Sequence, residues 1–149
     1  EAFDLMIFED DPSLVILATD TGLFSTADDG ESFDVISDGL SSLQVNAVAR
    51  LPGGRIFAGT PDGVFSAAAP GETFERRSPA VCWADSLLGV DEAIFVACDE
   101  GVWWSGDEGL TWNELPGMAD RWPTSLGVDG NGYLLVGTWG FGLHAAPLP

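Results

Sequence analysis

The chain has 149 residues, of which 46% are hydrophobic, which is enough to bury the core of one domain. Its 24 acidic residues face five arginines and no lysine, and the resulting net charge of −19 argues against binding to nucleic acid or to anionic membrane surfaces, both of which require a basic patch. No run of 18 apolar residues is present, so no membrane insertion is expected. Two interpretations of the acid excess remain open: a well-solvated surface, or a surface that attracts a cationic partner.

Taken in chain order, three segments share one pattern and a fourth repeats part of it. They read "ILATDTGLFSTADDGESFDVI" from Ile16, "IFAGTPDGVFSAAAPGETFERR" from Ile56, "IFVACDEGVWWSGDEGLTWNEL" from Ile94 and "LLVGTWGFGLHAAPLP" from Leu134. The glycines that open the third expected strand of each copy recur at intervals of 38 to 41 residues and are Gly22, Gly63, Gly101 and Gly142. Such a period indicates a repeat architecture.

Each copy reads as four short strands between turn signals. In the second copy the expected strands are residues 44–50, 55–60, 64–68 and 73–77, with "PGG" at 52–54 and "PDG" at 61–63 as hairpin turns. Four strands in about 40 residues are typical of a β-propeller blade. The sequence therefore predicts an all-β protein, a β-propeller of four-stranded antiparallel blades in one domain, residues 1–149, with repeats at about 1–41, 42–80, 81–119 and 120–149.

The fourth repeat reaches Pro149 before the position of its outer strand, so the last blade is expected to be incomplete. Either the blades close as a small four-bladed ring with a thin last blade, or they form part of a larger propeller. An open array would leave sheet faces and edges that favour association. We expect the larger assembly.

A polar turn follows the third expected strand. The stretch "SGDEGLTW" in the third copy aligns with "TADDGESF" in the first, which gives the candidate turn residues Ser105, Asp107, Gly109, Thr111 and Trp112 together with Thr26, Asp28, Gly30, Ser32 and Phe33. The second copy keeps only Gly71, Thr73 and Phe74. The pattern resembles the Asp-box of the bacterial neuraminidase repeat (BNR) family. The hydroxyl and carboxylate side chains are expected to bond the turn's own amides, glycine to supply positive φ, and the aromatic ring to pack into the blade. Its expected role is structural.

The resemblance also raises sialidase activity, which the residues do not support. Sialidases bind the substrate carboxylate with three arginines from different blades and use a tyrosine nucleophile. The single tyrosine is Tyr133, and the five arginines occupy unrelated positions in their blades: Arg50, Arg55, Arg76, Arg77 and Arg121. We therefore expect sialidase-like repeats that are not a sialidase, with no catalytic residue, no metal site and no cofactor.

Three further residues have two interpretations each. His144, the only histidine, aligns with Phe24, Phe65 and Trp103 and is expected to be a packed or surface ring. Cys82 and Cys98 fall on the first two strands of the third copy, where either a cross-strand disulfide or two buried thiols would fit.

Six tryptophans are many for this length, and three aromatic residues are candidates for binding. Trp139 and Phe141 lie in "GTWGFG", a turn one residue longer than its counterparts, where they could be exposed. Trp104 replaces a serine of the first two copies and is a weaker candidate, whereas Trp103 and Trp112 are expected in the core.

The sequence favours a non-catalytic protein-protein interaction or scaffold module, a subunit or part of a larger assembly. The expected partner is another protein or a second copy. The alternative is carbohydrate binding, or glycoside hydrolysis, by exposed tryptophans and carboxylates. An extracytoplasmic or secreted location is favoured.

Overall fold

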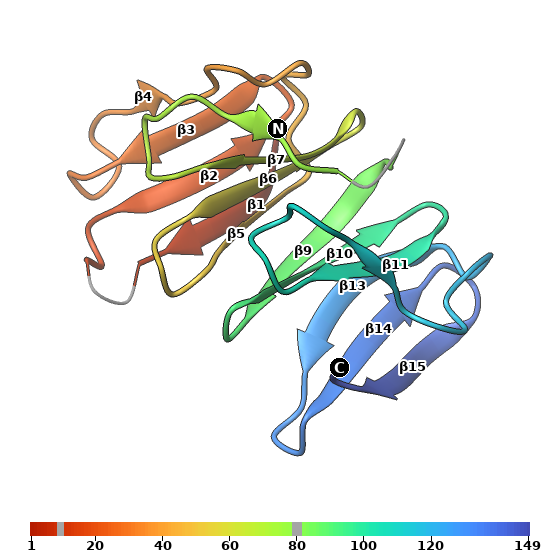
Figure 1. Ribbon diagram of the computed structural model, residues 1–149. Helices are drawn as coiled ribbons and strands as arrows, with labels where there is room; N and C mark the ends of the chain where they lie inside the picture. Colours follow the sequence, from red (N-terminus) through yellow and green to blue (C-terminus); the bar gives the residue numbers. More distant parts are fainter. Residues whose placement is uncertain (9–10, 79–81) are drawn as a thin grey trace.

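The computed structural model describes residues 1–8, 11–78 and 82–149. These residues fold into four antiparallel sheets and contain no helix (Figure 1). The described part of the chain therefore holds no helix long and apolar enough to cross a membrane. We call the sheets blades 1 to 4 in chain order. Blade 1 contains β1 (Ala2–Ile7), β2 (Val15–Thr19), β3 (Gly22–Thr26) and β4 (Asp34–Val35). Blade 2 contains β5 (Ala47–Arg50), β6 (Ile56–Thr60), β7 (Gly63–Ala67) and β8 (Glu75–Arg76). Blade 3 contains β9 (Ala84–Val90), β10 (Ala93–Cys98), β11 (Gly101–Ser105) and β12 (Asn113–Glu114). Blade 4 contains β13 (Pro123–Val128), β14 (Tyr133–Thr138) and β15 (Gly142–Pro147).

Each blade is a meander in which neighbouring strands follow one another along the chain. The turn between the second and third strands needs the glycine of the repeat, because Gly63 has a φ of +119°, which is strained for other residues. In the same turn the hydroxyl of Thr60 accepts the amide of Asp62 at 3.1 Å and donates to the carbonyl of Gly63 at 3.0 Å. A threonine and a glycine therefore close this hairpin, as Thr19 and Gly22 do in blade 1 and Thr138 and Gly142 do in blade 4, whereas blade 3 has Cys98 in place of the threonine.

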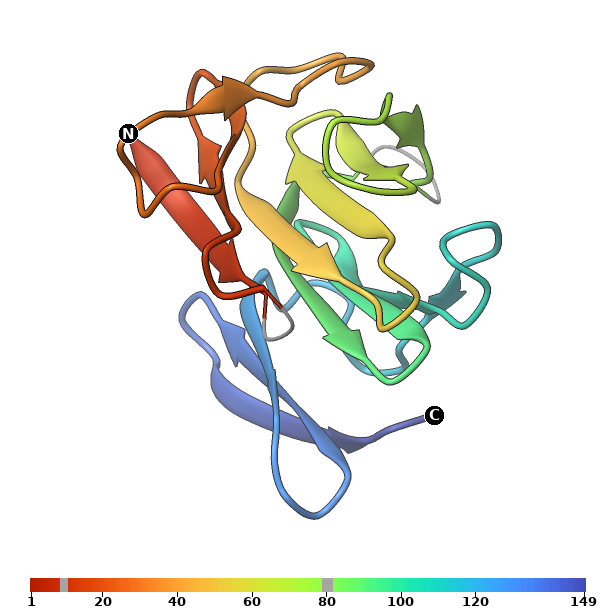
Figure 2. The same ribbon diagram turned by 90° about the vertical axis from the view of Figure 1, so that its left-hand side faces the viewer.

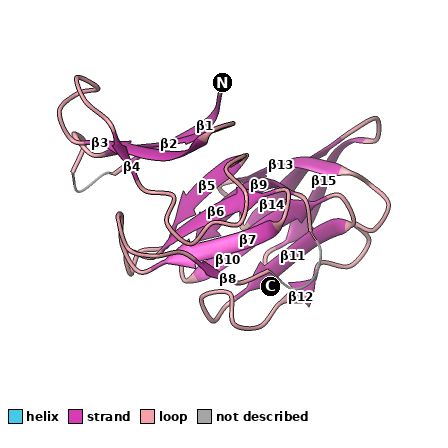
Figure 3. Cartoon of the chain, turned by 90° about the horizontal axis from the view of Figure 1, so that it is seen from above, coloured by secondary structure: helices cyan, strands magenta, loops and turns pink. Residues whose placement is uncertain are grey.

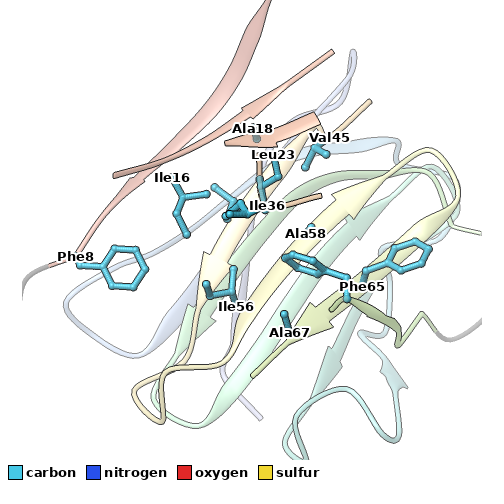
Figure 4. Packing of buried hydrophobic residues seen from close by; sticks show 12 residues of the cluster. Phe8, Ile16, Ala18, Leu23, Ile36, Val45, Ile56, Ala58, Phe65 and Ala67 are labelled. Atoms are coloured by element: carbon cyan, nitrogen blue, oxygen red, sulfur yellow. The ribbon is translucent and has the colours of Figure 1, made fainter. Parts of the chain in front are cut away.

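The four blades lie next to one another in chain order (Figures 2 and 3). Their first strands lie side by side, β1 against β5, β5 against β9 and β9 against β13. Figure 4 shows how Ile16 and Leu23 of blade 1 face Ile56 and Phe65 of blade 2, and all four are buried. The core is thus divided into three apolar layers, one between each pair of consecutive blades.

The outer strands are shorter than the sequence predicts. In blade 2, β8 spans two residues, because Thr73 and Phe74 bond across to blade 1 instead of to β7. The hydroxyl of Thr73 donates to a carboxylate oxygen of Asp38 at 2.7 Å, and the amide of Phe74 donates to the carbonyl of Asp38 at 2.8 Å. Thr73 and Phe74 therefore contact blade 1 instead of extending strand β8.

The outward face of blade 1 carries apolar side chains that no blade of the described residues covers. Leu5 occupies the same register position as Val48 and Leu87, since each pairs with the residue two positions before the end of the second strand. Leu5 is 55% exposed, whereas Leu87 is 8% exposed against blade 2. Phe33 is 48% exposed, whereas its equivalent Phe74 is 3% exposed against blade 1.

The expectation that the aromatic ring of the Asp-box packs into the blade is wrong for Phe33, which is 48% exposed. The ring at this position packs against the preceding blade, as Phe74 and Trp112 do, and blade 1 has no preceding blade among the described residues.

Blade 4 is exposed on the face that points away from blade 3. Leu143 occupies the position of Leu23, Val64 and Val102, one residue after the glycine that opens the third strand. Those three side chains are fully buried against the following blade, whereas Leu143 is 69% exposed. Blade 1 therefore exposes the face that blades 2 and 3 pack against the preceding blade, and blade 4 exposes the face that blades 1 to 3 pack against the following blade.

Candidate binding cleft between blades 3 and 4

A cavity of about 300 Å³ lies where the ends of blades 3 and 4 meet, and it is lined by Asp85, Asp99, Trp122, Thr124 and Trp139. All five belong to one end of their blades, either to the start of the first strand or to the turn between the second and third strands. A larger hollow of about 500 Å³ lies elsewhere, where Phe8, Arg50 and Gly89 are among the lining residues. We call the first cavity the cleft.

Two tryptophans form the apolar part of the cleft. Trp122 immediately precedes β13, and Trp139 lies in the turn between β14 and β15. The backbone amide of Trp139 donates to the carbonyl of Trp122 at 2.9 Å, which ties the two segments together. Their side chains remain open, with exposed fractions of 57% for Trp122 and 73% for Trp139. Trp122 has a φ of +46°, which is uncommon for a bulky residue and occurs where the surrounding structure holds the backbone.

Two carboxylates form the polar part of the cleft. Asp99 lies in the turn between β10 and β11, and one of its oxygens accepts the amide of Trp83 at 3.3 Å. Asp85 is the extra residue of a bulge in β9, where Ala84 pairs with Cys98 and Ser86 with Ala97. A bulge redirects the side chain of the inserted residue.

The environment of Asp85 raises its pKa above the usual value. The main cause is the partial loss of its water shell, the second is the negative charge of Asp99, and a hydrogen bond from the Trp83 side chain acts in the opposite direction. No arginine of the described residues forms an ion pair with Asp85 or Asp99. The cleft therefore holds two neighbouring negative charges that no arginine of the described residues neutralises.

A disulfide holds this end of blade 3. Cys82 and Cys98 are joined, with their Cα atoms 5.4 Å apart. Cys82 is three residues before Asp85, and Cys98 is next to Asp99, so the bond fixes the start of β9 against the turn that carries Asp99. Of the two interpretations that the sequence left open, the structure has the disulfide.

The three aromatic residues that the sequence analysis proposed for binding lie in different surroundings in the structure. Trp139 lines the cleft. Phe141 is half exposed in the same turn, with the Arg121 guanidinium 5.6 Å from its ring centre, but does not line the cavity. Trp104 is partly buried between blades 3 and 4, stacked on Phe95 with ring centres 6.5 Å apart, and lines a different cavity.

Sequence reasoning missed Trp122, Asp85 and Asp99. One signal was available for Trp122, since Trp83 and Trp122 both stand just before the first strand of their blades. No signal distinguished Asp85 and Asp99 among the chain's 24 acidic residues.

The two complete Asp-box turns lie at the other end of their blades, between the third and fourth strands, and bond internally. The hydroxyl of Ser105 donates to Asp107 at 2.7 Å and accepts the amide of Gly109 at 2.8 Å, while Asp107 accepts the amide and hydroxyl of Thr111 at 2.8 and 2.6 Å. Hydrogen bonds from Thr111 and Ser105 lower the pKa of Asp107 from 3.8 to about 2.

Blade 1 repeats the arrangement. Hydrogen bonds from Ser32 and Thr26 likewise lower the pKa of Asp28 to about 2. The indole nitrogen of Trp112 donates to the carbonyls of Gly109 and Arg77, so the turn of blade 3 is fastened to blade 2.

The arginines do not converge on one point. Arg50 lies 4.6 Å over the ring of Phe8 and Arg121 lies over Phe141, while Arg76 donates to Ser78. Arg55 and Arg77 both reach Ser66 and pair with Glu108 and Glu75, and these residues belong to the outer part of blade 2 and the box turn of blade 3. His144 lies on β15 opposite Val136, and its Nε2 is buried without a partner among the described residues.

No protein-family model matches the chain, and no curated protein matches it. Solved structures do match. An ancestral GH74 enzyme has a TM-score of 0.79 at 18% identity over 98% of this chain, and the extracellular domain of a one-component system from B. thetaiotaomicron has a TM-score of 0.76 at 19% identity over 91%. YCF48 bound to D1 peptide has a TM-score of 0.72 at 13% identity over 98% of this chain.

These similarities show a fold shared with β-propeller proteins. The chain spans 22% of the GH74 enzyme, 20% of the extracellular domain and 51% of YCF48. The similar structures include an enzyme, an extracellular domain of a one-component system and a protein bound to a peptide, so similarity of fold does not select among activities.

Proposed function

We propose that the chain is a non-catalytic, extracytoplasmic protein-interaction module that works within a larger β-propeller assembly. The observation that carries this proposal is the exposure of apolar residues at positions that are buried between blades elsewhere in the chain, namely Leu5 and Phe33 on blade 1 and Leu143 on blade 4. Exposed apolar patches of this kind favour association. The disulfide supports an oxidising compartment.

The chemistry of these faces indicates what covers them. The outward face of blade 1 has the side-chain pattern that blades 2 and 3 direct at the preceding blade, and blade 4 has the pattern that blades 1 to 3 direct at the following blade. The fitting occupant of both faces is therefore a further blade built on the same repeat. In a preparation of this chain alone, the blades with that pattern belong to other copies, so blade 4 of one copy is expected to pack on blade 1 of the next.

Light scattering after size exclusion tests this proposal across a range of protein and salt concentrations. We expect the mass to rise with concentration, and to rise further with salt because the net charge of −19 opposes association. Leu5→Asp and Leu143→Asp should each reduce association. Leu110→Asp is the matched control, because Leu110 is 68% exposed in the box turn of blade 3 and lies on neither outer face. Equal behaviour of all four proteins would overturn the proposal.

Carbohydrate binding or hydrolysis is the second candidate, and the cleft is the observation that favours it. Aromatic rings beside carboxylates suit sugars, and a carboxyl with a raised pKa, such as Asp85, suits a general acid. A panel of soluble glycans with tryptophan fluorescence for binding and reducing-sugar release for hydrolysis tests this candidate. Saturable binding to one sugar class that is abolished by Trp139→Ala would support it over the first proposal.

A further inference from the structure

We propose that the cleft binds a cationic side chain, preferentially an arginine guanidinium, presented by a protein partner. The inference rests on the proposed binding function and adds the chemistry of what is bound. It stands on the placement of two exposed indole rings and two carboxylates around one cavity.

The first argument is electrostatic. Asp85 and Asp99 are close enough for the charge of one to act on the other, and no described arginine pairs with either of them. A cation that contacts both carboxylates adds two attractions that outweigh their mutual repulsion. The surrounding surface, with a net charge of −19, also draws cations toward the cleft.

The second argument concerns the shape of the ligand group. Trp122 and Trp139 present open rings tied together by a backbone hydrogen bond. A planar guanidinium can stack on an indole face and still donate to two carboxylates in its plane, whereas an ammonium offers one compact charge. The chain uses the same chemistry internally, since Arg50 lies over Phe8 and Arg121 over Phe141.

The third argument compares this ligand with a neutral sugar. The polar groups of the cleft are two carboxylates, the hydroxyl of Thr124 and the N–H groups of two indoles, so acceptor oxygens outnumber donors. A guanidinium has five N–H donors and no acceptor, and it matches such a site without leaving a donor unmet. A neutral sugar would leave the negative charges of Asp85 and Asp99 uncompensated.

The test uses N-acetyl-arginine amide as the probe, with tryptophan fluorescence and indole N–H signals in NMR as readouts. N-acetyl-citrulline amide is the neutral isostere, N-acetyl-lysine amide tests the preference for a planar cation, and cellotetraose is the sugar arm. Free arginine separates a small-molecule source from a peptide-like one, because it carries an α-ammonium and an α-carboxylate where the blocked probe has peptide-like amides. We expect saturable binding of the blocked arginine that is at least about tenfold tighter than binding of the citrulline probe and that weakens with salt.

Three variants test whether the arginine probe binds in the cleft. Asp85→Asn and Asp99→Asn keep the side-chain shape and an acceptor oxygen, and each should weaken binding of the arginine probe severalfold. Asp34→Asn removes an equal charge from the exposed strand β4 of blade 1 and should leave binding nearly unchanged. Equal affinity for arginine and citrulline probes, an equal effect of the three variants, no binding of the arginine probe, or binding of cellotetraose alone would each overturn the inference. None of these outcomes alters the association measurement, so failure of the inference is distinguishable from failure of the proposed assembly.

Discussion

The backbone amide of Trp139 donates a hydrogen bond to the carbonyl of Trp122 at 2.9 Å, so the turn of blade 4 and the segment entering the same blade hold two indoles at one rim. Neither ring is needed for the core, since both are more than half exposed. Aromatic side chains left open in this way are typical of contact sites.

Trp139→Ala should therefore separate binding from stability. The variant keeps the backbone hydrogen bond to Trp122 and removes a side chain that is 73% exposed, so we expect its free energy of unfolding to change by no more than about 0.5 kcal/mol. Its response to the arginine probe should be lost. Urea denaturation and the NMR titration check the two parts separately. A loss of several kcal/mol would mean that the ring packs in the fold.

The Asp-box of blade 3 should contribute to stability in a pH-dependent way. The pKa of Asp107 is lowered to about 2 from 3.8, so its carboxylate stabilises the fold above about pH 4, and this contribution is lost as the pH falls toward 2. Asp107→Asn should lower the urea midpoint at neutral pH and flatten its decline over this interval. The expected loss is smaller for Asp28→Asn, because no blade among the described residues lies beside the turn of blade 1. Equal losses would contradict this account of the box.

Ser105→Ala tests the buried part of the same turn. The Ser105 side chain is fully buried and receives the amide of Gly109 at 2.8 Å, so alanine leaves that amide without its acceptor. We expect a loss of about 1 to 3 kcal/mol in the free energy of unfolding, measured by urea denaturation. A neutral result would mean that water replaces the hydroxyl.

The disulfide should stabilise both the fold and the cleft. Cys82 and Cys98 are 16 residues apart, and loop closure of this size is worth about 3 kcal/mol. Replacing both cysteines with serine should lower the free energy of unfolding by about this amount. It should also weaken binding of the arginine probe under conditions where the variant stays folded, because Asp99 is next to Cys98. Unchanged affinity would show that the turn is held by other contacts.

Close contact between blades can be tested at a glycine. A Cβ atom on Gly89 would come within 2.5 Å of the carbonyl oxygen of Arg50 in the neighbouring blade, whereas one on Gly53 would meet nothing within 4 Å. Gly89→Ala should cost about 1 to 3 kcal/mol, and Gly53→Ala should be close to neutral. Thermal unfolding of the two variants provides the comparison. A neutral Gly89→Ala would show that the two blades can move apart at little cost.

The repeat was predictable from sequence because its signals are local. Gly63 and Thr60 close a turn, and the Ser105 to Trp112 pattern specifies another, whatever lies around them. The exposure of Phe33 was not predictable, because it depends on whether another blade covers the ring and not on the residue itself. The cleft was only partly predictable: Trp139 stood out in a longer turn, but Asp85 and Asp99 meet through a bulge and a disulfide, which are tertiary features.

The most direct test of the account mixes two variants that should each have lost one half of the interface. A Leu5→Asp copy keeps the blade 4 face, and a Leu143→Asp copy keeps the blade 1 face, so each alone should stay monomeric. Mixed in equal amounts, they should form a dimer that grows no further, because one intact interface remains per pair. Light scattering on the mixture should show the mass of two chains. If the mixture remains at the mass of one chain while the unmodified chain associates, the blades do not pair head to tail; if the unmodified chain is also monomeric at every salt concentration, the outer faces do not serve assembly.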